Sequence, residues 1–84
     1  MISTSRYASE ETRRYAKKLA GDELFISRGK KTIAKLVETA RKRGEHKISI
    51  VEEENKKPSR ISMIEVSEIG KWKWSDEVQV SDGI

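Results

Sequence analysis

The chain has 84 residues, of which 35% are hydrophobic and 38% are charged, and its formal net charge is +4. This length predicts one domain that buries only about 60% of the surface that its unfolded chain exposes, which excludes a deep catalytic cleft combined with a cofactor-binding fold. The sequence contains no cysteine, which excludes disulfide scaffolds and cysteine-ligated metal sites.

The positive charge is concentrated in the first part of the chain. Residues 1–50 contain 13 Lys/Arg and 6 Asp/Glu, a net charge of +7, whereas residues 51–84 contain 5 and 8, a net charge of −3. Basic residues grouped in this way are expected of a protein that binds a polyanion, although an unevenly charged, solvated surface gives the same count. No apolar run approaches the roughly 20 residues of a membrane span, so we expect a cytoplasmic protein.

The start of the chain predicts a strand followed by a helix. Residues 2–5 form a short first strand. Ser9 suits a helix N-cap, and Gly21 suits the position after a helix C-terminus, so the helix spans about residues 9–20. Its apolar stripe consists of Thr12, Tyr15, Ala16, Leu19 and Ala20.

A second strand and a second helix follow. Leu24-Phe25-Ile26 is short, apolar and β-prone, which predicts a buried strand. Thr32 suits the cap of a helix that runs to about Arg43, and Gly44 closes it. The inward stripe of this helix is Ile33, Leu36, Val37 and Ala40.

The rest of the chain alternates with a period of two, which predicts strands. Residues 47–51 form a third strand, residues 52–58 a polar connection, and residues 60–66 a fourth strand antiparallel to the third. Trp72, Trp74, Val78 and Val80 share the same spacing and predict an extra C-terminal strand. The expected fold is therefore a small α/β domain over residues 1–84, a single mixed sheet with two helices in the order β-α-β-α-β-β.

Three stretches of the sequence carry a resemblance to a known family. They are Ser3-Thr4-Ser5-Arg6 before the basic helix, Phe25-Ile26-Ser27-Arg28-Gly29-Lys30 after the second strand, and Asn55-Lys56-Lys57-Pro58-Ser59-Arg60-Ile61 at the fourth strand. In this order they resemble the N-terminal half of a Brix domain of the short archaeal members, over residues 2–66. Residues 67–84 lie outside the resemblance, as a C-terminal extension or extra strand.

The resemblance implies a fold and a function. Brix proteins are ribosome-biogenesis factors that bind ribosomal RNA and associated proteins. Their domain has two similar halves, each like the anticodon-binding domain of class II aminoacyl-tRNA synthetases. A second half has no counterpart in this sequence.

The candidate RNA-binding residues lie around the ends of the first two strands. Arg28-Gly29-Lys30 stands between a strand end and a helix start, where backbone N–H groups and cationic side chains bind phosphate. A plain turn with solvated charges is the alternative interpretation. The residues that we expect to contact RNA are Thr4, Ser5, Arg6, Arg13, Arg14, Lys17, Arg28, Gly29, Lys30 and Lys31.

Aromatic residues are the other candidates for recognition. Unpaired RNA bases stack on aromatic side chains, and Tyr7 is the one near the predicted basic edge, whereas Phe25 is expected in the core. Trp72 and Trp74 are candidates for a dimer or partner contact, because aromatic residues anchor interfaces. Alternatively, both indoles cover the monomer's own thin core.

Catalysis finds little support in the sequence. His46 is the only histidine, so neither a metal site with two imidazoles nor a justified Ser-His-Asp set is present. Consecutive carboxylates at Glu52, Glu53 and Glu54 would alternate between the faces of a strand. We therefore expect no catalytic residue, no metal and no cofactor.

Three functions follow as hypotheses. The first is a non-catalytic RNA-binding factor that acts on ribosomal RNA during ribosome assembly or processing. The second is a protein-interaction module of an assembly complex, with ribosome-assembly proteins or a second copy of the chain as partner. The third, which follows from the anticodon-domain likeness, is a transfer-RNA-binding accessory domain.

Overall fold

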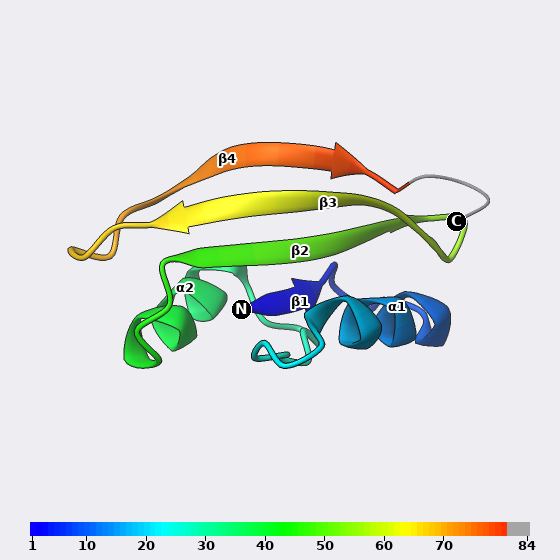
Figure 1. The fold of residues 1–84 in the computed structure, drawn as a ribbon, viewed down its shortest axis with the longest axis horizontal. Coiled ribbons are helices and arrows are strands. Elements are labelled where there is room, and N and C mark those ends of the chain that lie inside the picture. The colour runs from blue at the N-terminus through cyan, green and yellow to red at the C-terminus, as the bar shows by residue number, and fades with distance from the viewer. Residues whose placement is uncertain (81–84) are drawn as a thin grey trace.

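A mixed four-stranded sheet forms the frame of the molecule in a computed structural model that describes residues 1–80 (Figure 1). The strands are β1 (Ile2–Thr4), β2 (Lys47–Glu54), β3 (Lys57–Val66) and β4 (Trp72–Gln79), and they lie in that order across the sheet. β1 is parallel to β2, whereas β3 is antiparallel to both β2 and β4. The small α/β fold and the antiparallel third and fourth predicted strands are confirmed.

The two helices begin and end close to where the sequence predicts. α1 spans Glu10–Ala20 and α2 spans Ile33–Lys42. The side chain of Ser9 accepts a hydrogen bond from the Thr12 N–H, and the side chain of Thr32 caps α2 in the same way. These side chains satisfy helix N–H groups that have no partner inside the helix, so a local signal was enough to locate both starts.

The apolar stripes of the helices are confirmed with one exception. Thr12, Ala16 and Ala20 of α1 are buried, but Leu19 is 43% exposed. In α2, the buried residues are Leu36, Val37 and Ala40, and Ile33 is partly buried against them. The stripe of α1 is narrower than predicted because Leu19 lies at the margin of the surface that faces the sheet.

The helices cover opposite faces of the sheet. Ile50 and Val51 are consecutive residues of β2, so their side chains point to opposite faces. Ile50 packs in one core cluster with Leu36 of α2, whereas Val51 packs in a second cluster with Ala16 of α1. We call these two sides of the sheet the α2 face and the α1 face. Each face has its own thin hydrophobic core.

The predicted second strand is reduced to a single bridge. Phe25 pairs with Ile2 in a parallel arrangement, but Leu24-Phe25-Ile26 forms no further ladder. The Ile2 N–H donates to the Leu24 carbonyl at 2.8 Å, and the Ile26 N–H donates to the Ile2 carbonyl at 2.9 Å. Because β1 has only three residues, it offers this segment too few backbone partners for a full strand.

The connection between β2 and β3 is shorter than predicted. The strands continue through residues 52–54 and 57–58 and are joined by Asn55 and Lys56 alone. Both turn residues have positive φ angles, 53° and 64°, as a two-residue hairpin turn of this hand requires. The polar residues 52–58, which were predicted to form a loop, are instead the exposed end of the β2–β3 hairpin.

The extra C-terminal strand exists, and it is the edge strand β4. All of its residues are exposed, because no helix covers this side of the sheet (Figure 1). A register shift between Met63 and Ile64 of β3 leaves Ser75 of β4 without an opposite residue. The part of the predicted extension that falls on residues 81–84 lies outside the described residues. Neither helix within residues 1–80 is long and apolar enough to span a membrane.

Candidate nucleic-acid interface

The ends of β1 and of the 24–26 segment lie side by side, as the sequence predicts. The Tyr7 N–H donates to the Gly29 carbonyl at 3.4 Å. The Arg28 Nη1 donates to the Thr4 carbonyl at 2.9 Å. Two segments that are more than 20 residues apart in sequence therefore meet at one corner of the sheet, and the chain that follows them leads into α1 and α2.

Arg28 lies inside this corner and is only 7% exposed. Besides its bond to Thr4, its Nε donates to the Lys31 carbonyl at 2.5 Å. Burial lowers the pKa of Arg28 from its ordinary value, the neighbouring charge of Arg6 lowers it further, and Glu52 opposes both effects. The guanidinium holds the two loops together, and this geometry leaves it little surface for a bidentate contact with phosphate.

Thr4 and Ser5 are also turned inward. Thr4 is 1% exposed, and its hydroxyl donates to the Ser5 carbonyl at 3.0 Å. The Ser5 backbone N–H donates to the Val51 carbonyl, which extends the β1–β2 pairing, and the buried Ser5 hydroxyl has no hydrogen-bond partner within residues 1–80. Thr4 and Ser5 therefore support the backbone of the corner and offer little side-chain surface to a ligand.

The side chains of Arg6 and Lys30 form the exposed part of the corner. Within the described residues neither makes an ion pair with a carboxylate. The Arg6 guanidinium lies over the Tyr7 ring, 5.7 Å from its centroid. Lys31 is partly buried and donates from Nζ to the Ser27 carbonyl at 2.9 Å. Two unpaired cations and an aromatic ring are thus presented together to solvent.

The basic residues of α1 have different surroundings. Arg14 pairs with Glu10 at 2.7 Å, one helical turn away, and both side chains are largely exposed. The Lys17 ammonium lies over the Phe25 ring at 5.7 Å from the centroid, beside the 24–26 segment. Arg13 is exposed and unpaired among the described residues. Of these three residues, Arg13 and Lys17 have no carboxylate partner among the described residues, whereas the exposed Arg14 shares its charge with Glu10.

Sequence reasoning identified Tyr7 as an aromatic residue near the basic edge but missed its backbone conformation. Its φ angle is +56°, in the left-handed region that bulky residues rarely adopt, and its side chain is 67% exposed. Nothing in the sequence indicated this positive φ angle, because residues in that conformation are usually Asn, Asp or Gly.

The β4 edge carries a different chemistry. Trp72 and Trp74 are 39% and 52% exposed and pack against each other edge to face, with ring centroids 5.9 Å apart. They pair with Val66 and Ile64 of β3 and so belong to the α2 face of the sheet. The prediction that the indoles cover the monomer core is therefore only partly met, since both present exposed surface.

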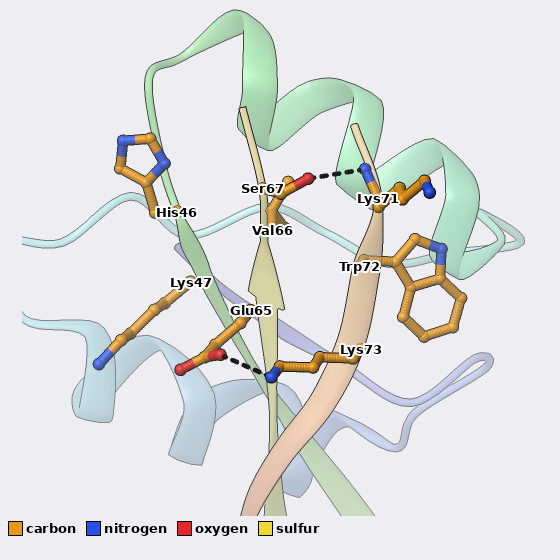
Figure 2. Close-up of a pocket in the computed structure, with 8 residues that line it drawn as sticks. All are labelled: His46, Lys47, Glu65, Val66, Ser67, Lys71, Trp72 and Lys73. Atoms are coloured by element: carbon orange, nitrogen blue, oxygen red, sulfur yellow. Dashed lines mark hydrogen bonds and ion pairs between the residues drawn. The ribbon is translucent and has the colours of Figure 1, made fainter. Parts of the chain in front are cut away.

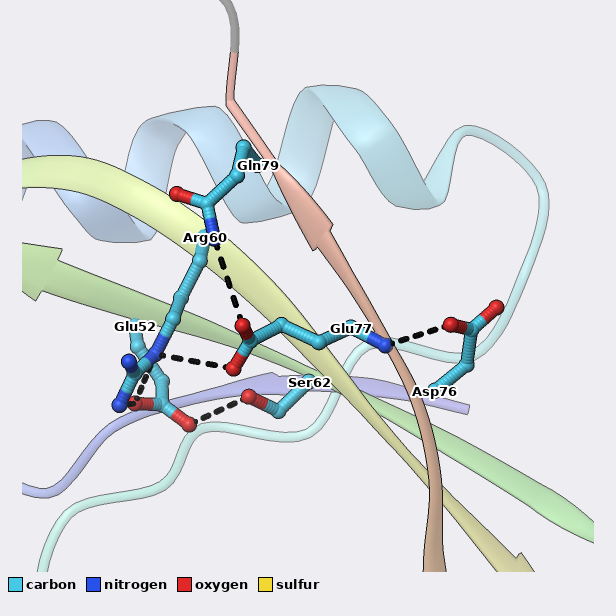
Figure 3. A network of polar contacts seen from close by, with 6 residues as sticks. All are labelled: Glu52, Arg60, Ser62, Asp76, Glu77 and Gln79. Carbon is cyan, nitrogen blue, oxygen red and sulfur yellow. Dashed lines mark hydrogen bonds and ion pairs between the residues drawn. The ribbon is translucent and has the colours of Figure 1, made fainter.

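Carboxylates also lie close to Trp74. A shallow hollow beside it is lined by Glu52, Arg60, Ser62, Asp76 and Glu77, three carboxylates against one guanidinium. Arg60 bonds the Glu52 carboxylate at 2.7 Å and lies 3.6 Å from Glu77, and Ser62 donates to Glu52 at 2.6 Å (Figure 3). Arg60 therefore ties β3 to the acidic run of β2. Phosphate would be repelled here.

The opposite end of β4 has a second hollow with the reverse charge. His46, Lys47, Glu65, Lys71, Trp72 and Lys73 are among its lining residues (Figure 2). Lys47, Glu65 and Lys73 occupy adjacent positions on three neighbouring strands, and Lys73 pairs with Glu65 at 3.8 Å. His46 is exposed, and no group of three His, Asp or Glu residues among the described residues is arranged to hold a metal ion.

Glu53 is used structurally. Its carboxylate accepts hydrogen bonds from the Thr12 hydroxyl at 2.7 Å and from the Ser9 backbone N–H at 3.1 Å. The Thr12 bond is the main reason that the pKa of Glu53 lies below its ordinary value, although partial burial opposes the shift. This carboxylate ties the positive end of α1 to β2.

Comparison with known proteins relates this fold to ribosome-biogenesis proteins. No protein-family model matches the sequence, and no curated protein matches it. Among solved structures, a probable ribosomal biogenesis protein from Aeropyrum pernix K1 superposes with a TM-score of 0.86 at 24% identity, over 94% of this chain and 46% of that one. An archaeal Imp4-like protein gives a TM-score of 0.68 at 27% identity, over 84% of this chain and 45% of that one.

The chain spans less than half the length of each of these structures. The match is therefore to a half-domain, as the resemblance in the sequence implies. The chain therefore has the fold of about half of a probable ribosomal biogenesis protein and of an archaeal Imp4-like protein of the Brix-domain family.

Proposed function

We propose that this chain is a non-catalytic RNA-binding factor that acts on ribosomal RNA during ribosome assembly or processing. The observation that carries the proposal is the corner of the sheet where Arg6 and Lys30 are exposed without carboxylate partners among the described residues. Its likeness to a probable ribosomal biogenesis protein and to an archaeal Imp4-like protein supports the choice of ribosomal RNA.

The residues proposed for RNA binding divide into two groups by their exposure. Arg6, Arg13, Arg14, Lys17, Gly29, Lys30 and Lys31 reach the surface and would contact phosphates. Thr4, Ser5 and Arg28 would act by positioning the two loops, because their polar groups are directed into the protein. Phosphate contacts of this kind set affinity and give a strong dependence on salt, without reading sequence.

Fluorescence-anisotropy titration of ribosomal RNA fragments at two salt concentrations tests this function. We expect wild-type affinity to fall with salt, and an Arg6→Glu/Lys30→Glu variant to bind much more weakly and with a shallower salt slope, by roughly 0.7 per lost contact on a single strand. A Lys57→Glu/Lys71→Glu variant makes the same change in net charge on exposed residues elsewhere and serves as the matched control. Equal losses in both variants would contradict a localised site.

The same titration separates ribosomal from transfer RNA. If transfer RNA displaces a ribosomal fragment at far lower concentration than unlabelled fragment does, the chain is a transfer-RNA-binding accessory domain instead. We expect the reverse order, because the structural relatives are ribosome-biogenesis proteins.

A second proposal concerns β4, which we propose pairs with β4 of a second copy of the chain. An edge strand presents unpaired backbone groups, and exposed aromatic residues anchor interfaces. Lys73 and Asp76 lie on the same face, since they pair with Glu65 and Met63. An antiparallel two-fold arrangement with Lys73 opposite Asp76 would make that ion pair twice and bring the two Trp74 side chains together.

Sedimentation analysis tests the homodimer. We expect a dimer mass for the wild type and a monomer mass for a Trp72→Ser/Trp74→Ser variant, while Tyr7→Asn, which removes an exposed aromatic elsewhere, stays dimeric. A monomer mass for the wild type at micromolar concentration would rule out the second copy and direct attention to ribosome-assembly proteins as the partner of this strand.

A further inference from the structure

The Arg6–Tyr7 turn has features that the fold itself does not need. Tyr7 is 67% exposed and adopts a φ angle of +56°, a conformation that is unfavourable for a bulky residue. Its aromatic ring contributes little buried apolar area, so hydrophobic stabilisation does not account for a tyrosine at this position. Strained, exposed residues of this kind cluster at functional sites.

Two contacts hold the turn in its conformation. The Tyr7 N–H donates to the Gly29 carbonyl at 3.4 Å, which links the turn to the loop that carries Lys30. The Arg6 guanidinium lies 5.7 Å from the centroid of the ring. The buried Arg28 side chain joins the same two loops from below through its bonds to the Thr4 and Lys31 carbonyls. The ring is therefore presented from a fixed turn, with the Arg6 guanidinium over it and the loop that carries Lys30 bonded to its backbone.

An aromatic ring beside exposed cations matches the chemistry of unpaired nucleotides. A base stacks on the face of a tyrosine ring and also on a guanidinium plane, while the adjoining phosphates bind Arg and Lys. Bases inside a duplex are already stacked and cannot reach such a ring.

We infer that the Arg6–Tyr7 turn binds an unpaired base of single-stranded RNA, which stacks on the Tyr7 ring while its neighbouring phosphates contact Arg6 and Lys30. This inference rests on the proposed function and specifies the form of RNA that the corner takes. In this arrangement Tyr7 recognises the unpaired base, while Arg6 and Lys30 provide most of the electrostatic attraction to the phosphates.

The other exposed aromatic residues are less suited to this role. Trp74 borders the hollow lined by Glu52, Asp76 and Glu77, where phosphate would be repelled. Trp72 packs against Trp74 at an interplanar angle of 85°, so the two indoles cover part of each other's surface. Phe25 is partly buried and packs against the core beneath α1, which leaves less of its ring open to a base. Tyr7 therefore combines exposure with unpaired cations in a way that these residues do not.

Titrations with two RNAs of equal length, one single-stranded and one a blunt duplex, test the inference on wild type, Tyr7→Asn and Tyr7→Trp. Asparagine tolerates positive φ but cannot stack as an aromatic ring does, whereas tryptophan keeps the stacking surface. We expect Tyr7→Asn to bind the single strand about 5- to 150-fold more weakly, with its duplex affinity unchanged, and Tyr7→Trp to bind like the wild type.

A probe strand with a fluorescent base analogue reports stacking directly, independently of affinity. Stacking on Tyr7 should quench the analogue in the wild-type complex, and Arg13→Glu, which leaves the ring in place, should bind more weakly but quench equally at saturation. Unquenched fluorescence at saturation, or equal affinity of wild type and Tyr7→Asn for the single strand, would overturn the inference.

The outcomes distinguish this inference from the proposed function. If both RNAs bind the wild type equally and only the Arg6→Glu/Lys30→Glu variant fails, the RNA-binding function stands and the role of Tyr7 is rejected. If the wild type binds neither RNA at low salt, both are rejected.

Discussion

At the scale of single residues, the difference between Arg28 and Lys30 decides how the corner works. Both residues are basic and belong to one tripeptide, yet Arg28 is 7% exposed and bonded to two backbone carbonyls, while Lys30 is exposed. A guanidinium offers several fixed donors and satisfies two acceptors in different loops, which a lysine ammonium does less well. Arg28 is accordingly a positioning residue.

Replacing Arg28 tests this assignment. We expect Arg28→Met to lower the free energy of unfolding by about 1–3 kcal/mol, because it leaves two inward-facing carbonyls without their donor. Lys30→Met should change it by less than about 0.5 kcal/mol, as exposed substitutions usually do. Urea denaturation followed by circular dichroism measures both, and equal midpoints for the two variants would contradict a structural role for Arg28.

At the scale of elements, α1 is attached to the sheet by a side chain from β2. Glu53 accepts hydrogen bonds from Ser9 and Thr12 at the positive end of the helix, and its pKa lies below the ordinary value, chiefly because of the Thr12 bond. A carboxyl whose pKa is lowered by folding stabilises the folded state above the unfolded pKa. That stabilisation is lost as the pH falls through the lower, folded pKa.

The stability of the protein should therefore depend on pH through Glu53. Between about pH 5 and pH 3 we expect the urea midpoint of the wild type to fall more steeply than that of Glu53→Gln, which has no proton to take up at this position. Parallel pH profiles for the two proteins would show that the carboxylate contributes nothing beyond what the amide provides.

The β2–β3 hairpin is an element in which one residue is poorly matched to its backbone. Asn55 suits a positive φ angle, but Lys56 adopts 64° without the freedom of glycine. We expect Lys56→Gly to raise the free energy of unfolding by up to about 1 kcal/mol, whereas Ser59→Gly, inside β3, should lower it by about 0.5–1 kcal/mol. Thermal melting of both variants checks the opposite signs.

At the scale of the whole molecule, the two proposed surfaces lie on opposite edges of the sheet. The RNA corner is built at β1, and the exposed Trp pair lies on β4, with β2 and β3 between them. Sites on separate elements without shared contacts usually behave additively. We expect Trp72→Ser/Trp74→Ser to leave affinity for a short single-stranded RNA within about twofold of the wild type, in anisotropy titrations at concentrations where the wild type is monomeric.

Several parts of this fold follow from local sequence signals. The starts of both helices at Ser9 and Thr32 depend on caps that act within three residues, and their buried stripes follow from a period that the sequence displays directly. The antiparallel pairing of β2 with β3 follows from two alternating segments separated by one polar connection, although that connection was expected to be longer than it is. The basic surface of the first half was likewise visible as a charge count.

The sequence by itself therefore determined both helices with their caps, the strands other than residues 24–26, and the sign of the charge in each part of the chain, since each depends on residues close in sequence. Only the tertiary structure decided that Arg28 is buried, that residues 24–26 make one bridge and that both tryptophans are exposed. The physical reason is that burial depends on which distant segment lies opposite a side chain. Arg28 is buried because the fold brings Thr4 within hydrogen-bond reach of it, and the tryptophans are exposed because the fold places no helix over β4.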